Sequence, residues 1–199
     1  AGIAGMVAAR TALALGAQVK IFDHDISKLR KIQHYLGQQV FTSVIHPAVL
    51  FRALASADAV IGNLRYIYGS ERFMVSEDLV KTMKTGAVIV DLSVDQGGCF
   101  ETSKCRTLKN PMFEKHGVIH YCLPNISARV ARTASMALSN IFAPMMLKIA
   151  RSGSVEQAVK ESAGFRNGAY VFGGVLVNRL IGDYYDMPSS DIGLLIAGY

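Results

Sequence analysis

The sequence predicts an α/β fold, a doubly wound parallel sheet with helices on both faces, followed by a helical C-terminal segment. Short apolar strands alternate with helical patterns of about ten residues, which is the order of βαβ units with right-handed crossovers. Hydrophobic residues make up 51% of the 199 residues and charged residues 18%, so the chain can bury a core. Both observations exclude a disordered polypeptide.

The first elements follow from apolar runs that end at glycines. The apolar residues of Ala4–Leu15 favour a buried helix that stops at Gly16. Residues 18–22 predict a buried strand, and apolar residues at helical spacing predict a helix over Ile26–Leu36, closed by Gly37. The alternation continues through strand 39–42, helix 47–55, strand 58–62, a helix capped by Ser76, strand 87–91 and strand 118–121.

The alternation of strands and helices ends after Asn125. Residues 130–150 predict a long apolar helix, kinked or interrupted at Pro144. A glycine-rich tail follows, with short helical patterns at 155–162 and 176–184. We therefore divide the chain into an α/β domain over residues 1–127 and a long connecting helix with a helical C-terminal segment over residues 128–199.

Composition excludes several classes of protein. The net charge of +6 comes from dispersed cations without interleaved aromatics, so we expect no nucleic-acid partner. No stretch reaches the roughly 18 uncharged apolar residues of a membrane span, so we expect no membrane partner. Three cysteines without metal-ligand spacing predict neither disulfides nor a metal site, and they suit a reduced cytoplasm. Because the sequence starts at Ala1 without a leader pattern, we expect an internal piece of a longer protein.

A glycine turn opens the first helix. Residues 1–5 read Ala-Gly-Ile-Ala-Gly and match the last five positions of a GxGxxG turn. In such a turn Gly2 lets the backbone approach a pyrophosphate and Gly5 lets the helix pack closely on the sheet. The N-terminus of the helix offers unpaired N–H groups to the phosphates.

An acidic residue follows at the distance that this turn requires. Asp23 lies 21 residues after Gly2, at the end of the next strand, where a Rossmann-like fold holds a carboxylate for the adenosine ribose. Together the two features predict a dinucleotide site, with NAD favoured over NADP because the charge of Asp23 would repel a 2′-phosphate. The alternative is that the glycines only permit close packing and that Asp23 caps the next helix.

The strand before the glycine turn is missing from the sequence. In the strand order 3-2-1-4-5-6 it lies between residues 18–22 and 58–62. Unpaired backbone groups in the centre of a sheet are costly. We therefore expect upstream residues in the natural protein, and some segment that fills this position in any folded form.

The loop after strand 87–91 is the best candidate for chemistry. It reads Ser-Val-Asp-Gln-Gly-Gly-Cys-Phe-Glu over residues 93–101. Ligands of open α/β sheets lie beyond the carboxyl ends of the strands, so we expect Asp95 and its glycine pair to face the nicotinamide end of a bound dinucleotide. The alternative is that Asp95 caps a turn with these glycines.

At this point the sequence resembles the NAD domain of L-alanine dehydrogenases, a family that shares its architecture with the soluble part of proton-translocating transhydrogenases. The resemblance runs from Ala1 to about Ala150 and rests on AGIAGMVAAR, VKIFDHDISKLR, VIVDLSVDQGGCFETS, VIHYCLPN and RTASMALSN. It implies NAD-dependent oxidative deamination of L-alanine to pyruvate and ammonium, with Asp95 as the catalytic aspartate. It also implies a catalytic His and a substrate-binding Arg and Lys in an N-terminal domain outside this sequence, and a homo-oligomeric protein. We therefore expect this piece alone to bind cofactor at best.

The resemblance also implies which residues contact the cofactor. The expected contacts are Gly2, Ile3, Ala4 and Gly5 at the pyrophosphate, Asp23 and Lys28 at the adenosine ribose, Leu64 beside the ring system, Leu92, Ser93, Val94 and Asp95 at the nicotinamide ribose, and Leu123, Asn125 and Ile126 at the nicotinamide amide. Three stretches depart from the family pattern. Residues 63–69 replace a segment with Pro and Gly, Ile45 replaces a common Ser, and residues 127–131 lack a common Pro.

Two other functions remain open from the sequence. A transhydrogenase-like subunit would use the same NAD(H) site to exchange hydride with a membrane partner, and a non-catalytic module would only bind the dinucleotide.

Of the other reactive side chains, Cys99 and Cys122 are expected to be buried small residues, and His120 is expected to be a hydrogen-bonded core histidine.

Overall fold

The computed structural model describes residues 1–64 and 74–198. The chain forms two units, Ala1–Ala128 and Arg129–Tyr199. Within the described residues, none of the helices has both the length and the apolar character that crossing a bilayer requires.

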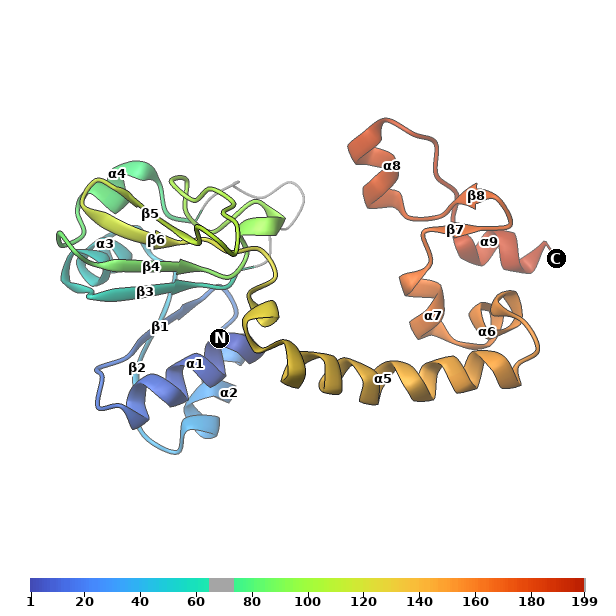
Figure 1. Cartoon of the computed structure of the whole chain (residues 1–199), viewed down its shortest axis with the longest axis horizontal. Helices are drawn as coiled ribbons and strands as arrows, with labels where there is room; N and C mark the ends of the chain where they lie inside the picture. The colour runs from blue at the N-terminus through green and yellow to red at the C-terminus, as the bar shows by residue number, and fades with distance from the viewer. Residues whose placement is uncertain (65–73, 199) are drawn as a thin grey trace. The chain divides into compact units, whose positions relative to one another are not determined.

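The first unit contains two sheets (Figure 1). Strands β1 (Lys20–Asp23) and β2 (Phe41–Val44) form a parallel pair. The second sheet has the order β3-β4-β6-β5 and consists of β3 (Ala59–Gly62), β4 (Val88–Asp91), β6 (Val118–Tyr121) and β5 (Met112–Lys115). Strands β3, β4 and β6 are parallel, whereas β5 is antiparallel to β6. The first unit therefore has the predicted α/β architecture, with its described strands divided between two sheets.

Strands β1 and β3 do not pair with each other. The predicted strand order requires one more strand between them, and no strand of the described residues lies there. The expected interruption of the sheet is confirmed for the described residues, and the expectation that another segment fills it stays a prediction. The core is divided in the same way. Ala9, Ile21, Leu29 and Ile32 form one cluster, and ten residues around Ile89, Phe100 and Val118 form the other.

The helices of the first unit have the predicted order. They are α1 (Ile3–Ala14), α2 (Ile26–Leu36), α3 (Pro47–Ser56), α4 (Glu77–Lys81) and the 3₁₀ turns η1 (Val94–Gln96) and η2 (Ile126–Val130). Capping explains why α2 matches its prediction. The Asp25 carboxylate accepts a 2.7 Å bond from the Ser27 N–H, and Gly37 ends the helix in the left-handed conformation at φ 66°.

The burial predicted for the first helix is wrong. Only Ala9 of α1 is buried, whereas Ile3 is 81% exposed and Val7 is 53% exposed. The apolar residues of α1 lie around most of the helix, and the two-stranded β1–β2 sheet offers too little surface to cover them.

Two strands also differ from the prediction. Strand β2 starts and ends two residues later than expected, because its register pairs Phe41 with Lys20 and Val44 with Asp23. Strand β5 was not predicted, and it adds an antiparallel edge to a sheet expected to be wholly parallel. The turn between β5 and β6 is His116-Gly117, and both residues have positive φ, as two-residue hairpins of type I′ require.

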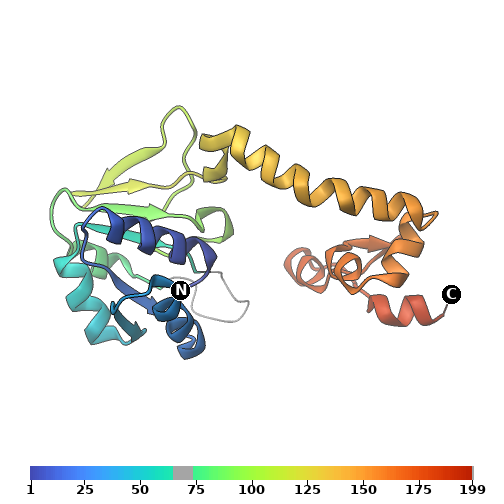
Figure 2. The same cartoon turned by 90° about the horizontal axis from the view of Figure 1, so that it is seen from below.

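The second unit consists of helices and one small hairpin. Its elements are α5 (Ala131–Arg151), α6 (Val155–Glu161), α7 (Ala163–Gly168), β7 (Val171–Phe172), β8 (Val175–Leu176), α8 (Arg179–Tyr185) and α9 (Ile192–Ala197). Helix α5 continues through Pro144 as one helix of 21 residues, so the predicted interruption is wrong (Figure 2). The pattern expected to be helical from residue 176 begins as β8 and becomes helical at Arg179.

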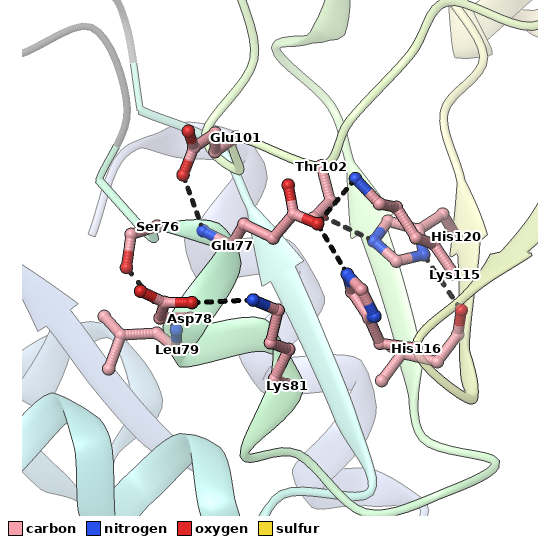
Figure 3. Close-up of polar contacts among 11 residues, drawn as sticks. Ser76, Glu77, Asp78, Leu79, Lys81, Glu101, Thr102, Lys115, His116 and His120 are labelled. Carbon is pink, nitrogen blue, oxygen red and sulfur yellow. Dashed lines mark hydrogen bonds and ion pairs between the residues drawn. The ribbon is translucent and has the colours of Figure 1, made fainter.

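A charged cluster joins the start of α4 to the β5–β6 hairpin (Figure 3). The Glu77 carboxylate accepts a 2.9 Å bond from Lys115 Nζ and a 2.6 Å bond from His116 Nε2. The hydrogen bonds from Lys115 and then His116 lower the pKa of Glu77 to about 2. The Glu77 N–H in turn donates to a carboxylate oxygen of Glu101, just after the loop that carries Asp95.

This cluster predicts a specific pH dependence of stability. Because the pKa of Glu77 is lower in the folded state, its contribution is complete above the unfolded pKa of roughly 4.3 and is lost as the pH falls towards about 2. In that pH interval the unfolded protein binds up to about one more proton at Glu77 than the folded protein does. We expect Glu77→Gln to flatten the decline of unfolding free energy in this pH range, as measured by urea unfolding. Glu114→Gln on β5 is the control and should keep the wild-type slope.

Candidate functional site

The candidate site lies at the carboxyl ends of the parallel strands. Gly62 at the end of β3 is paired with Asp91 at the end of β4, and the Leu92 N–H donates a 2.8 Å bond to the Gly62 carbonyl. Strand β6 is aligned with β4 so that Tyr121 lies opposite Val90. The segments that follow β3, β4 and β6 therefore leave the sheet at the same edge.

Asp23 is a buried carboxylate at the end of β1. It is 4% exposed, and its Oδ1 atom accepts a 3.0 Å bond from the Asp25 N–H. Burial acts to raise the pKa of Asp23, whereas the hydrogen bond from the Asp25 N–H and the charge of Lys28 act to lower it. The exposed Lys28 lies on the following helix.

The start of α1 has free N–H groups and no competing acid. Gly2 is the N-cap residue, makes no side-chain capping bond, and is followed by a first turn without acidic residues. A Cβ atom at Gly2 would lie 4.0 Å from Asn63 Nδ2, so this turn lies near the end of β3. At Gly5 an added Cβ would meet nothing within 4 Å, so the close helix–sheet contact predicted there is absent from the described structure. Ile3 and Ala4 are exposed at the helix start.

Leu64 connects the end of β3 to the loop that follows β4. Its N–H donates a 3.2 Å bond to Cys99 Sγ, and Cys99 is buried. The remainder of the unusual stretch at residues 63–69, from residue 65 onward, lies outside the described residues. Ile45, another departure from the family pattern, packs against the larger core cluster.

The loop after β4 presents Asp95 to solvent. Ser93 and Val94 are buried, and the Ser93 carbonyl accepts 2.9 Å bonds from the N–H groups of Gln96 and Gly98. Gly97 and Gly98 close the turn at φ 105° and 80°, a region that favours glycine. Asp95 itself is exposed and makes no hydrogen bond to another described residue, so it does not cap this turn. The folding of the loop leaves its carboxylate available for a ligand.

The residues expected at the nicotinamide amide follow β6. Leu123 is buried, and Asn125 has the left-handed conformation at φ 55°. The Ser127 hydroxyl donates a 2.6 Å bond to the Asn125 side-chain oxygen, and Ile126 is exposed. Residues 126–130, which include most of the third departure, form η2.

These residues lie where parallel strands of the two sheets end. Asp23 ends β1, Gly2 lies near Asn63 after β3, and Leu64 bonds to Cys99 in the loop that carries Asp95. A buried acid, a helix N-terminus without a side-chain cap and an exposed acid are therefore the kinds of group that the adenosine ribose, the pyrophosphate and the nicotinamide ribose of a dinucleotide need. The donor and acceptor groups fit such a ligand.

Asp91 belongs to this site but is not among the residues predicted from the sequence. Asp91, the last residue of β4, is 1% exposed and accepts hydrogen bonds from the loop. The signal was present in Val-Ile-Val-Asp, because an acid that ends a buried apolar strand needs donors from the protein.

Cys99 and Cys122 are not placed to act as nucleophiles. Burial raises the pKa of Cys99 and of Cys122, and both residues are fully enclosed, whereas Cys105 is exposed. His120 is buried between a 2.7 Å contact to Thr102 Oγ1 and a 2.9 Å contact to the Val118 carbonyl, as expected for a core histidine.

This difference predicts selective labelling of the thiols. In the native protein we expect iodoacetamide to modify Cys105 at least about tenfold faster than Cys99 or Cys122, because only an exposed thiol meets the reagent readily. Peptide mass spectrometry after timed labelling measures the three rates. In denaturant the rates should become similar, and fast native labelling of Cys99 would contradict the packing described here.

The chain was compared with known proteins. The sequence profile of the family described as "Alanine dehydrogenase/PNT, C-terminal domain" matches residues 1–179. The chain belongs to this family. It is 36% identical to the alanine dehydrogenase of Mycolicibacterium smegmatis over 197 residues, which are 99% of the chain and 53% of that relative.

The solved structures that are similar to this chain point to the same family. An L-alanine dehydrogenase superposes with a TM-score of 0.83 at 34% identity, over 93% of this chain and 51% of that one. A transhydrogenase from Sinorhizobium meliloti superposes with a TM-score of 0.68 at 25% identity, over 90% of this chain and 48% of that one. The chain thus spans about half the length of these relatives, and alanine dehydrogenase is the closer of the two in both measures.

Proposed function

We propose that this chain is the NAD-binding part of an NAD-dependent alanine dehydrogenase, which converts L-alanine and water reversibly to pyruvate and ammonium. The observation that carries the proposal is the exposed Asp95 on a glycine-closed turn after β4, together with the buried Asp23 at the end of β1, each at the carboxyl end of a parallel strand. Family membership supports the reaction class. Residues 1–127 form the cofactor domain, and residues 128–199 form the long connecting helix and the C-terminal segment.

The residues of this chain bind and orient the cofactor. The N–H groups at Gly2–Gly5 hold the pyrophosphate, and Asp23 with Lys28 holds the adenosine ribose. Leu64 lies beside the ring system, Leu92, Ser93 and Val94 border the nicotinamide ribose, and Leu123, Asn125 and Ile126 form the pocket of the nicotinamide amide. When bound, NAD accepts the hydride from the substrate Cα.

Asp95 is the catalytic residue of this part of the protein. After hydride loss the substrate carbon must accept water and release ammonia, and both steps move protons near that carbon. The exposed Asp95 carboxylate, which has no internal partner among the described residues, takes up and returns these protons. We propose that the His, Arg and Lys needed to complete the site belong to an N-terminal domain, and that the whole protein is a cytoplasmic homo-oligomer.

The test measures NADH consumption by the whole protein with pyruvate and ammonium. We expect turnover that requires both substrates, and NADH binding that is tighter than NADPH binding in a fluorescence titration. Hydride exchange from NADH to an NADP analogue without an amino acid would instead favour the transhydrogenase-like alternative. Tight NADH binding with no turnover would indicate a non-catalytic module.

A further inference from the structure

The carboxylate of Asp91 lies beneath the loop that carries Asp95. It is 1% exposed and accepts three hydrogen bonds. Oδ1 accepts from the Ser93 N–H at 3.0 Å, and Oδ2 accepts from the Cys99 N–H at 2.8 Å and from the Ser103 hydroxyl at 2.6 Å. All three partners are donors, so the position needs a group that only accepts.

Two of these donors bracket the turn. Ser93 stands before it and Cys99 after it, so one carboxylate holds both ends of the segment that contains Asp95. The Ser93 carbonyl closes the same turn from within by accepting bonds from Gln96 and Gly98. Asp95 itself contributes no bond to another described residue. Its position is therefore set by the residues at the two ends of the turn.

The backbone also fits closely around Asp91. A Cβ atom at Gly98 would lie 3.0 Å from Asp91 Oδ2 and 3.3 Å from Ser103 Cβ, and Gly98 has φ of +80°. Gly98 therefore leaves room for the Asp91 carboxylate and also adopts the left-handed conformation that this turn requires.

We infer that Asp91 is the positioning residue for Asp95. This inference rests on the proposed function, because it concerns the proton transfer assigned to Asp95. A carboxylate is required, since an asparagine would direct its NH₂ group at the N–H of either Ser93 or Cys99 and would lose one end of the turn. A displacement of about 1 Å is enough to reduce a proton-transfer rate by about 10²-fold.

The test is a double-mutant cycle of Asp91→Asn and Asp95→Asn in the whole protein. We expect Asp91→Asn alone to lower kcat for alanine deamination by about 10²-fold, because Asp95 is displaced. In the Asp95→Asn background the same change should lower the residual kcat by less than about twofold, because no proton transfer is left to disturb. A merely structural role for Asp91 would give the same loss in both backgrounds and would overturn the inference.

Thr102→Val is the matched control for destabilisation. It removes a buried hydrogen bond to His120 outside the turn, so it should lower the unfolding midpoint without the background-dependent loss of kcat. If Asp91→Asn does not fold, Ser103→Ala replaces it. This milder variant removes one of the three donors, and it should lower kcat several-fold only when Asp95 is present.

The outcomes separate the two proposals. If Asp95→Asn keeps wild-type turnover, the proposed role of Asp95 is wrong whatever Asp91 does. If Asp95→Asn loses turnover and Asp91→Asn keeps it, or if the two losses simply multiply, only the positioning role of Asp91 is wrong.

Discussion

Asp95→Asn is expected to lower kcat for alanine deamination by about 10²–10⁴-fold in the whole protein, the range associated with losing one general acid–base group. Asparagine has the same shape as aspartate but cannot take up and return a proton. Because Asp95 is exposed and makes no hydrogen bond to another described residue, its replacement should leave the unfolding midpoint unchanged. Steady-state kinetics and thermal unfolding measure the two quantities.

Asp58→Asn is the matched control for this experiment. Asp58 immediately precedes β3, at the opposite edge of the sheet, and its exposed carboxylate pairs with Lys84 at 2.6 Å. An exposed ion pair of this kind contributes little to stability, so this variant should keep both turnover and unfolding midpoint. NADH affinity should change by no more than a few-fold in either variant. Unchanged turnover in Asp95→Asn would remove this residue from the mechanism.

Local signals account for the parts of the fold that the sequence predicts well. Helix α2 has an aspartate at its N-cap, two buried residues three positions apart, and a glycine at its end, so all its determinants lie within 13 residues, from Asp25 to Gly37. The pairing of Gly2 with Asp23 is equally local, since a single βαβ unit fixes the distance between them.

The remaining features depend on contacts that are distant in sequence. Strand β5 has four residues and no distinctive alternation, and only its pairing with β6 makes it a strand. The exposure of α1 depends on how much sheet surface lies beside it, which its own residues do not specify. Asp91 was not predicted because two of its three donors, Cys99 and Ser103, are 8 and 12 residues away.

Substitution of Gly62 is expected to cause a large loss of stability. Gly62 is buried at the end of β3, and an added Cβ would lie 2.6 Å from Phe100 Cε2 and 2.8 Å from Cys99 Cβ. Phe100 is 1% exposed within the larger core cluster, so its ring has no open space to enter. We expect Gly62→Ala to lower the unfolding free energy by about 1–3 kcal/mol, the usual cost of overpacking, as measured by urea unfolding.

The same substitution should also weaken NADH binding, because Cys99 joins Leu64 to the loop that carries Asp95. Gly168→Ala in α7 is the control, since an added Cβ there meets nothing within 4 Å. A second change tests the cause directly. Phe100→Leu removes the ring atom nearest to the new methyl group, so combining it with Gly62→Ala should cost less than the sum of the two separate losses. Additive losses would show that Gly62 is required for some reason other than the space occupied by Phe100.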